Sequence, residues 1–484
     1  MLKKNISQVL MILVVFSALE IWSYLGYLNP VVNAIVFVLL VSLALILSFY
    51  RLELGLLMIA GELFIGSFGY LFAWPFTYHL SLRIALWGVV LLVFCFNFLK
   101  QLIKSGRAAS YYQAIKNFSP LKYFILLFFF IFLALVNGLL RGHNLSIVFS
   151  DFNAWLYWLL LFPAIIIYNS ENQESRKRIQ ILFFAAAIWL SLKTLGLLFI
   201  FTHNLAIAPE IYTWLRQTLV GEMTATLGGW PRVFIQGQIY VGLAFFGILL
   251  NDLFSKKENN ICFGLKTFLL SLFFSTLLIS FSRSFWVAFC LTLILALIYI
   301  IYKLGFKKSW FLIFITGASL VGGFLLTYGA ATIPISRPGK FNADFISRVS
   351  NQGEAALSSR WSLLPVLINE ISLNPFLGQG YGATITYTSF DPRVLKNNPD
   401  GRYTTYAFEW GYLDLWLKLG SLGLGIYFLL LWMLWRQSFK VWPALSFGLI
   451  FLLITNIFTP YLNHPLGIGL LVLSSCLIAK DGVY

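Results

Sequence analysis

The sequence predicts an all-α, polytopic integral membrane protein, and three observations support this class: its composition, its recurring apolar runs and the placement of its basic residues. Of the 484 residues, 60% are hydrophobic and only 11% are charged, whereas soluble proteins carry about 25% charged residues. A helix needs about 20 apolar residues to cross a hydrocarbon core of roughly 30 Å. Because such runs recur along the whole chain, we expect residues 1–484 to form one transmembrane domain.

Apolar runs separated by polar, Gly or Pro residues predict about fourteen transmembrane helices. An alternative with twelve helices would merge or discard the short pairs around Ser282 or Pro334. The predicted ranges are 8–28, 31–49, 53–74, 81–103, 120–139, 153–169, 179–202, 235–254, 266–281, 284–302, 309–328, 409–435, 441–460 and 464–479.

The basic residues give this topology an orientation. If Lys3 and Lys4 are cytoplasmic, alternate connections carry basic clusters, as the positive-inside rule expects. Both termini are then cytoplasmic in either helix count. The net charge of +16 serves topology, and since the basic residues form no continuous soluble face, we expect no nucleic-acid partner. The clusters are Arg51, Lys100 to Lys122, Arg176 to Arg178, Lys256/Lys257, Lys303 to Lys308, Arg436/Lys440 and Lys480.

Cysteine usage predicts neither a disulfide framework nor a zinc site. The four cysteines all lie in or beside apolar segments, and the sequence contains no CxxC or Cys/His cluster. We also expect no cofactor.

The predicted outer side is rich in arginine, whereas lysine predominates on the inner side. Lysine and arginine set the orientation of the chain in the membrane equally well, so the bias needs another reason. It suggests that the outer arginines use their planar guanidinium groups to bind phosphate or carboxylate. The alternative is that these arginines pair with outer acids. The outer arginines are Arg83, Arg141, Arg216, Arg232, Arg283, Arg337, Arg348, Arg360, Arg393 and Arg402.

A large extracytoplasmic loop is predicted over residues 329–408, far longer than an ordinary connection. Within it, residues 359–371 have helical spacing of apolar residues and predict a short amphipathic helix, followed by a Gly-rich segment. Arg360 would open this helix, where helical N–H groups and the guanidinium together hold an anion. The alternative for Arg360 is an ion pair with Glu354 or another acid.

Two further arginines and several buried charges are candidates for function. Arg232 would lie at the mouth of a helix, and Arg283 would lie at or just below the outer interface, where an arginine is costly unless it is paired or faces a polar cavity. Asp414 and Lys418 are four residues apart and would neutralise one another on one helical face. No partner for Lys193 can be named from the sequence.

Three motifs in this order resemble the O-antigen ligase and polymerase family. They are the turn 281–286 (FSRSFW), the helix start 359–361 (SRW) with the following 374–382 (NPFLGQGYG), and the segment 409–413 (EWGYL) running to 419–423 (LGSLG). The resemblance spans roughly residues 230–470 and carries more weight than any single motif. It divides the chain into N-terminal helices, 1–230, and a catalytic region, 231–480.

The resemblance implies a bacterial envelope glycosyltransferase in the cytoplasmic membrane. Its donor would be a polyprenyl-diphosphate-linked glycan, with membrane lipid around it and, for a polymerase, a chain-length regulator as a further partner. It assigns the lipid diphosphate to Arg283 and Arg360. The ligase branch usually has a His-Asn pair where this chain has Glu409-Trp410, which favours the polymerase branch and makes Glu409 a candidate base.

We therefore predict a metal-independent polysaccharide polymerase in which Glu409, Arg360 and Arg283 are catalytic. Arg232, Arg402, His464 and Tyr412 are assigned to substrate binding. Glu409 is alternatively a helix-start carboxylate favoured by the dipole, with His464 or His203 as the base instead. The alternative functions are an O-antigen ligase that transfers a finished glycan to a lipid or protein acceptor, and a transporter or flippase of lipid-linked sugar.

Overall fold

The computed structural model describes residues 5–74, 80–105, 108–168, 173–225, 229–254, 262–334 and 355–478, and it is predominantly helical. Each of the fourteen predicted ranges contains a helix, which confirms the all-α class. The first half comprises α1 (Ile6–Leu28), α2 (Pro30–Tyr50), α3 (Leu52–Ile65), α4 (Leu82–Ser105), α5 (Ala108–Lys116), α6 (Leu121–Leu140), α7 (Leu145–Phe152), the 3-10 helix η2 (Asn153–Leu160), α8 (Leu161–Tyr168), α9 (Gln173–Thr202) and α10 (Ala208–Gln217).

The second half adds helices and two small antiparallel hairpins. The helices are α11 (Gln238–Phe254), α12 (Phe263–Ile279), α13 (Arg283–Leu304), α14 (Phe306–Thr332), α16 (Ala355–Leu373), α17 (Pro392–Asn397), α18 (Gly411–Val441), α19 (Pro443–Thr455) and α20 (Pro465–Ile478). The strands are β1 (Gly221–Ala225), β2 (Pro231–Ile235), β3 (Ile385–Thr388) and β4 (Arg402–Thr405).

Within the described ranges, nine helices are long and apolar enough to cross a membrane. Four shorter apolar helices lie in α11, α12, α19 and α20. The predicted total of about fourteen crossings therefore stays a prediction. The pair around Ser282 is not merged, because Phe281 adopts a positive φ of 46° and ends α12 before α13 begins.

The outward faces of the first two helices are apolar. Met11 is 62% exposed, Val14 68% and Leu39 62%. Water would not stabilise such surfaces, whereas a lipid environment accepts them, and the helical backbone satisfies its own hydrogen bonds there. The Asn29 side chain accepts a hydrogen bond from the Val31 N–H (2.9 Å) and starts α2 with Pro30 in its first turn.

Two pairs of opposite charges lie between helices. Lys193 on α9 contacts Glu20 on α1 at 2.8 Å, which identifies the partner that the sequence did not. Arg83 on α4 contacts Glu62 on α3 at 2.8 Å. Such pairing is what makes a charge tolerable at membrane depth.

Asp414 and Lys418 contact one another at 2.7 Å, as predicted, and Lys418 also contacts Asp151 on α7 at 2.6 Å. Asp151 in addition accepts a hydrogen bond from the Gly382 N–H at 3.0 Å. This network joins α7, α18 and the segment after α16.

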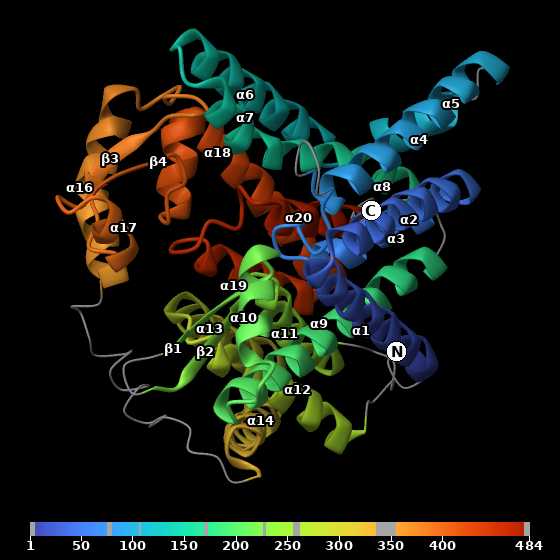
Figure 1. Cartoon of the computed structure of the whole chain (residues 1–484). Helices are drawn as coiled ribbons and strands as arrows, with labels where there is room; N and C mark the ends of the chain where they lie inside the picture. The colour runs from blue at the N-terminus through green and yellow to red at the C-terminus, as the bar shows by residue number, and fades with distance from the viewer. Residues whose placement is uncertain are drawn as a thin grey trace.

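Two connections that were predicted as loops contain β-hairpins. The hairpin β1–β2 pairs Gly221 with Ile235, and the hairpin β3–β4 pairs Ile385 with Thr405. Figure 1 shows α16, α17, β3 and β4 together on the left, with α5 on the far right. We call the side that carries the two hairpins the hairpin side. The helix predicted over 359–371 is confirmed, although α16 begins earlier, at Ala355.

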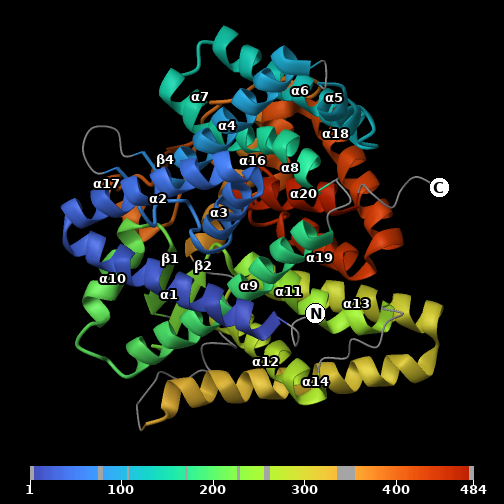
Figure 2. The same cartoon turned by 90° about the vertical axis from the view of Figure 1, so that its right-hand side faces the viewer.

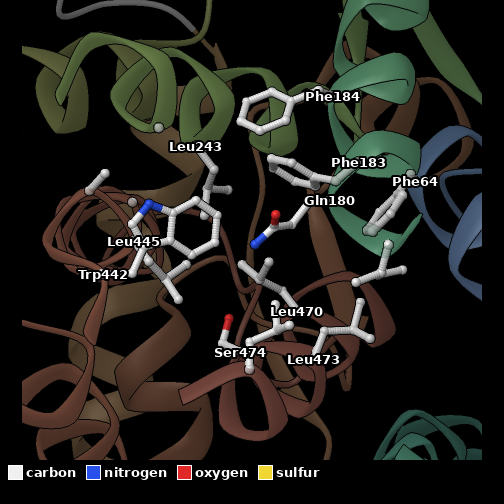
Figure 3. Close-up of a pocket in the computed structure, with 15 residues that line it drawn as sticks. Phe64, Gln180, Phe183, Phe184, Leu243, Trp442, Leu445, Leu470, Leu473 and Ser474 are labelled. Atoms are coloured by element: carbon white, nitrogen blue, oxygen red, sulfur yellow. The ribbon is translucent and has the colours of Figure 1, made fainter. Parts of the chain in front are cut away.

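Most helices pack into a hydrophobic core that extends from α1 to α20. A second, smaller core joins α16 to β3 and α18. Figure 2 shows α14 as a long helix at one edge of the bundle, and it packs along α12. A small apolar cavity of about 60 Å³ lies between α9, α11, α19 and α20, lined by residues that include Phe183, Leu243, Trp442 and Leu470. Figure 3 shows the Gln180 amide directed into this space.

Candidate active site

The turn between α12 and α13 places Arg283 on the hairpin side. The Trp286 indole N–H donates to the Leu277 carbonyl at 2.9 Å and closes the turn. Ser284 contacts Thr459 through their hydroxyl groups at 3.0 Å, which ties α13 to the segment between α19 and α20. Arg283 is the first residue of α13, so the structure fixes its backbone from both sides.

Arg232 lies in β2 beside the same turn. Its Nε donates to the Ser280 carbonyl at 3.0 Å, and its guanidinium lies 5.1 Å from the centre of the Phe234 ring. The hairpin therefore carries Arg232 to the end of α12. The sequence predicted Arg232 at a helix mouth; it lies instead in a strand that precedes α11.

Arg360 pairs with Glu409. The Arg360 Nε donates to the Glu409 carboxylate, and the Trp410 indole N–H donates to the Arg360 carbonyl at 3.1 Å. This bears out the alternative of an ion pair, with Glu409 as the acid. Because α16 begins at Ala355, Arg360 lies in its second turn. The prediction that Arg360 opens the helix and shares an anion with its N-terminal N–H groups is therefore wrong.

The three arginines come close enough to influence one another. Burial lowers the pKa of Arg232 from its ordinary value, and the charges of Arg360 and Arg283 act in the same direction, whereas Glu222 and Glu409 oppose them. Arg283 and Arg360 also repel one another. Guanidinium groups from β2, α13 and α16 thus influence one another, and the one on α16 pairs with Glu409, an arrangement suited to an anion with several charges.

A polar cavity of about 470 Å³ opens beside Glu409. Hydroxyl, amide and carboxylate side chains dominate its wall, and such groups hydrogen-bond in both directions. We call it the polar cavity. It is lined by Ser359, Tyr387, Ser389, Asp391, Val394, Asn397, Asn398, Tyr403 and Glu409.

Three predicted substrate-binding residues lie elsewhere. The Arg402 side chain is 80% exposed on β4 and contacts Asp400 at 3.5 Å. The Tyr412 hydroxyl donates to the Leu453 carbonyl at 2.7 Å, which joins α18 to α19. His464 lines a different cavity, of about 520 Å³, which we call the aromatic cavity. His203 stacks on Phe199 and contacts the Pro334 carbonyl.

Acid should destabilise the protein through His464. Burial, with a contribution from Arg83, lowers its pKa from 6.5 to about 3. The unfolded chain therefore binds a proton below about pH 6.5 that the folded chain refuses until about pH 3, and stability is lost as the pH falls through this window. We expect the unfolding temperature of His464→Gln to fall less than that of the wild type between pH 6.5 and pH 4.5. Equal losses would contradict this account.

Sequence reasoning missed the residues that hold the arginines in place. Trp410 was visible only as part of a motif, and its indole fixes the Arg360 backbone. Thr459 and the Ser280 carbonyl gave no signal, because their partners lie 175 and 48 residues away in the chain.

The fold is that of a polytopic membrane protein, and its three arginines lie in β2, at the start of α13 and in the second turn of α16. A family model described as O-antigen ligase matches residues 268–428. Residues 268–428 are thus similar to the family that the motifs resemble, and this supports a membrane enzyme of O-antigen assembly. Arg283, Arg360 and Glu409 lie within the matched range, whereas Arg232 lies before it. Comparisons with curated proteins and with solved structures found no significant match.

Proposed function

We propose that the protein is a polysaccharide polymerase that lengthens glycans on a polyprenyl diphosphate carrier at the outer side of the bacterial cytoplasmic membrane. One observation carries the proposal: the charges of Arg232, Arg283 and Arg360 act on one another, and Arg360 pairs with Glu409. A diphosphate supplies the negative charge that this cluster favours. Glu409 in place of the His-Asn pair of the ligase branch supports polymerisation.

The reaction balances with these residues alone. An acceptor hydroxyl oxygen bonds to the anomeric carbon of the donor glycan, the bond from that carbon to the diphosphate oxygen breaks, and its electron pair leaves with the lipid diphosphate. Glu409 accepts the hydroxyl proton. Guanidinium groups held in advance stabilise the charge that develops on the diphosphate. The polar cavity, whose wall includes Glu409, holds hydroxyl-rich sugar next to the reacting centre.

The Arg360–Glu409 pair suits an exchange of partners. The two side chains are 32% and 53% exposed, so solvent screens their attraction. An arriving diphosphate competes for Arg360 with a higher charge than one carboxylate. Substrate binding then releases Glu409 to act as the base at the moment when it is needed.

Replacement of Glu409 tests its role as the base. Glu409→Gln keeps a side chain of the same size but accepts no proton. We expect kcat to fall by about 100-fold or more, with little change in the affinity for polyprenyl diphosphate. A Glu409→Gln variant with normal turnover would remove Glu409 from the mechanism, and a simultaneous loss in His464→Ala would assign the role to His464.

Chelation tests the proposal that guanidinium groups stabilise the leaving group. Because three arginines supply the charge, we expect the initial rate in EDTA to equal the rate with Mg²⁺. Loss of activity in EDTA that Mg²⁺ restores would contradict metal independence.

The experiment that tests the function is a reconstituted reaction of purified protein with one lipid-linked repeat unit, read by gel and mass spectrometry. We expect a ladder of longer lipid-linked chains, which Arg360→Ala loses. A single transfer to a different lipid or protein acceptor would instead identify a ligase. Unchanged substrate moved across vesicles would identify a transporter.

A further inference from the structure

The aromatic cavity is separate from the polar cavity, and none of the three arginines lines it. Its wall combines elements of both halves of the chain, including α4, η2 and the segment between α19 and α20. Aromatic rings dominate the apolar part of this wall: Trp87, Phe149, Tyr157, Tyr406, Phe408 and Tyr461. A volume of about 520 Å³ falls within the range of small-ligand sites, which is about 300–1,000 Å³.

One segment, residues 403–409, borders both cavities. Tyr403 and Glu409 line the polar cavity, whereas Tyr406 and Phe408 line the aromatic cavity. Thr459 also lines the aromatic cavity and contacts Ser284, the residue that follows Arg283. The aromatic cavity is therefore next to the proposed reacting centre, although none of the three arginines lines it.

The charges in its wall neutralise one another. Lys418 contacts both Asp151 and Asp414, at 2.6 and 2.7 Å. Arg83 is held by Glu62 at 2.8 Å and donates to the Ser67 carbonyl at 2.7 Å. No surplus of positive charge faces the space, in contrast to the arginine cluster. The wall therefore offers no electrostatic attraction to an anionic ligand such as a phosphate or a uronic acid, and it favours an uncharged ligand.

Hydrogen-bonding groups that a ligand can contact also line the space. The Tyr157 hydroxyl is buried and has no hydrogen-bond partner among the described residues. His464 accepts from the Leu466 N–H through Nδ1 at 3.3 Å, which leaves Nε2 to carry the proton and donate. A buried hydroxyl without a partner is costly, because burial removes its hydrogen bonds to water, and a ligand hydroxyl would satisfy it.

From this combination we infer that the aromatic cavity binds an uncharged sugar unit of one of the two glycan substrates. Sugar rings present C–H faces that pack on aromatic rings and a rim of hydroxyl groups that hydrogen-bond to groups such as Tyr157 and His464. The inference rests on the proposed function. It gives the N-terminal helices, which lie outside the matched family range, a direct role in recognising the glycan.

The test uses the full chain in detergent and the repeat-unit oligosaccharide released from its lipid carrier by mild acid, so that the probe carries no diphosphate. Binding is measured by saturation-transfer NMR. We expect Tyr157→Phe, which removes only the hydroxyl, to weaken binding about fivefold to tenfold. Ala154→Trp should abolish sugar binding, because Ala154 lines the cavity and the larger indole would occupy its space. The matched control is Tyr168→Phe, since Tyr168 is also a buried tyrosine without a hydrogen-bond partner but does not line the cavity.

Any of three binding results would overturn the inference. The inference fails if the wild type does not bind the oligosaccharide at millimolar concentration, if wild type, Tyr157→Phe and Ala154→Trp bind it equally, or if polyprenyl diphosphate alone displaces it. Steady-state kinetics then identify which glycan occupies the cavity. Tyr157→Phe should raise KM for either the short or the long lipid-linked chain, and unchanged KM for both would also count against it. Sugar binding by a protein that makes no polymer would refute the proposed function and leave this site standing.

Discussion

Arg283→Ala should reduce polymer synthesis by about 100-fold to 1,000-fold, the loss typical when one preplaced charge-stabilising group is removed from a transition state. Arg283 opens α13 between the Trp286–Leu277 and Ser284–Thr459 contacts, so its backbone position should survive the substitution. The measurement is the initial rate of chain extension in the reconstituted reaction, with thermal unfolding measured in parallel.

Two variants separate this effect from a general loss of positive charge. Arg402→Ala removes an arginine whose side chain is 80% exposed and lies beside Asp400, and its rate should stay within about twofold of the wild type. Arg283→Lys keeps the charge but loses the fork that contacts two phosphate oxygens, so it should recover only part of the rate. Normal activity in Arg283→Ala would remove Arg283 from the site.

Lys418→Met should lower the free energy of unfolding by about 3–5 kcal/mol, the largest loss of stability that we expect from a single substitution. The side chains of Lys418, Asp151 and Asp414 are 2%, 7% and 1% exposed. Removal of the one cation leaves two carboxylates buried side by side without compensation. The network also joins α7 to α18, so both should loosen. Denaturant titration of the purified protein measures the change.

A combined variant shows whether charge is the cause. Lys418→Met with Asp151→Asn and Asp414→Asn removes both carboxylate charges as well, and it should recover most of the stability that the single change loses. If the triple variant is less stable than Lys418→Met alone, packing rather than charge balance accounts for the loss.

The transmembrane helices could be predicted because lipid imposes a simple requirement on sequence. A crossing needs about 20 apolar residues, and every predicted range contains a helix. The Asp414–Lys418 pair was predictable for a similar reason, since helical periodicity places residues four apart on one face. Asp151, the third member of that network, lies on α7, and no periodicity connects it to Lys418.

The candidate site was predictable only in part, because its members meet through tertiary structure. The motifs indicated Arg283, Arg360 and Glu409, but not that Arg360 and Glu409 would pair. Arg402 was assigned to substrate binding from its place in the outer loop, whereas the β3–β4 register places it opposite Thr388 on an exposed strand. The aromatic cavity gave no sequence signal, since its wall is assembled from segments between Phe68 and Pro465.

The most direct test of the central claim is the binding of polyprenyl diphosphate, without sugar, to the purified protein, measured by native mass spectrometry. We predict one lipid diphosphate per chain in the wild type, retained by Glu409→Gln and lost when Arg232, Arg283 and Arg360 are replaced together by glutamine. Equal binding by the wild type and the triple variant would contradict the assignment of the diphosphate to these three arginines.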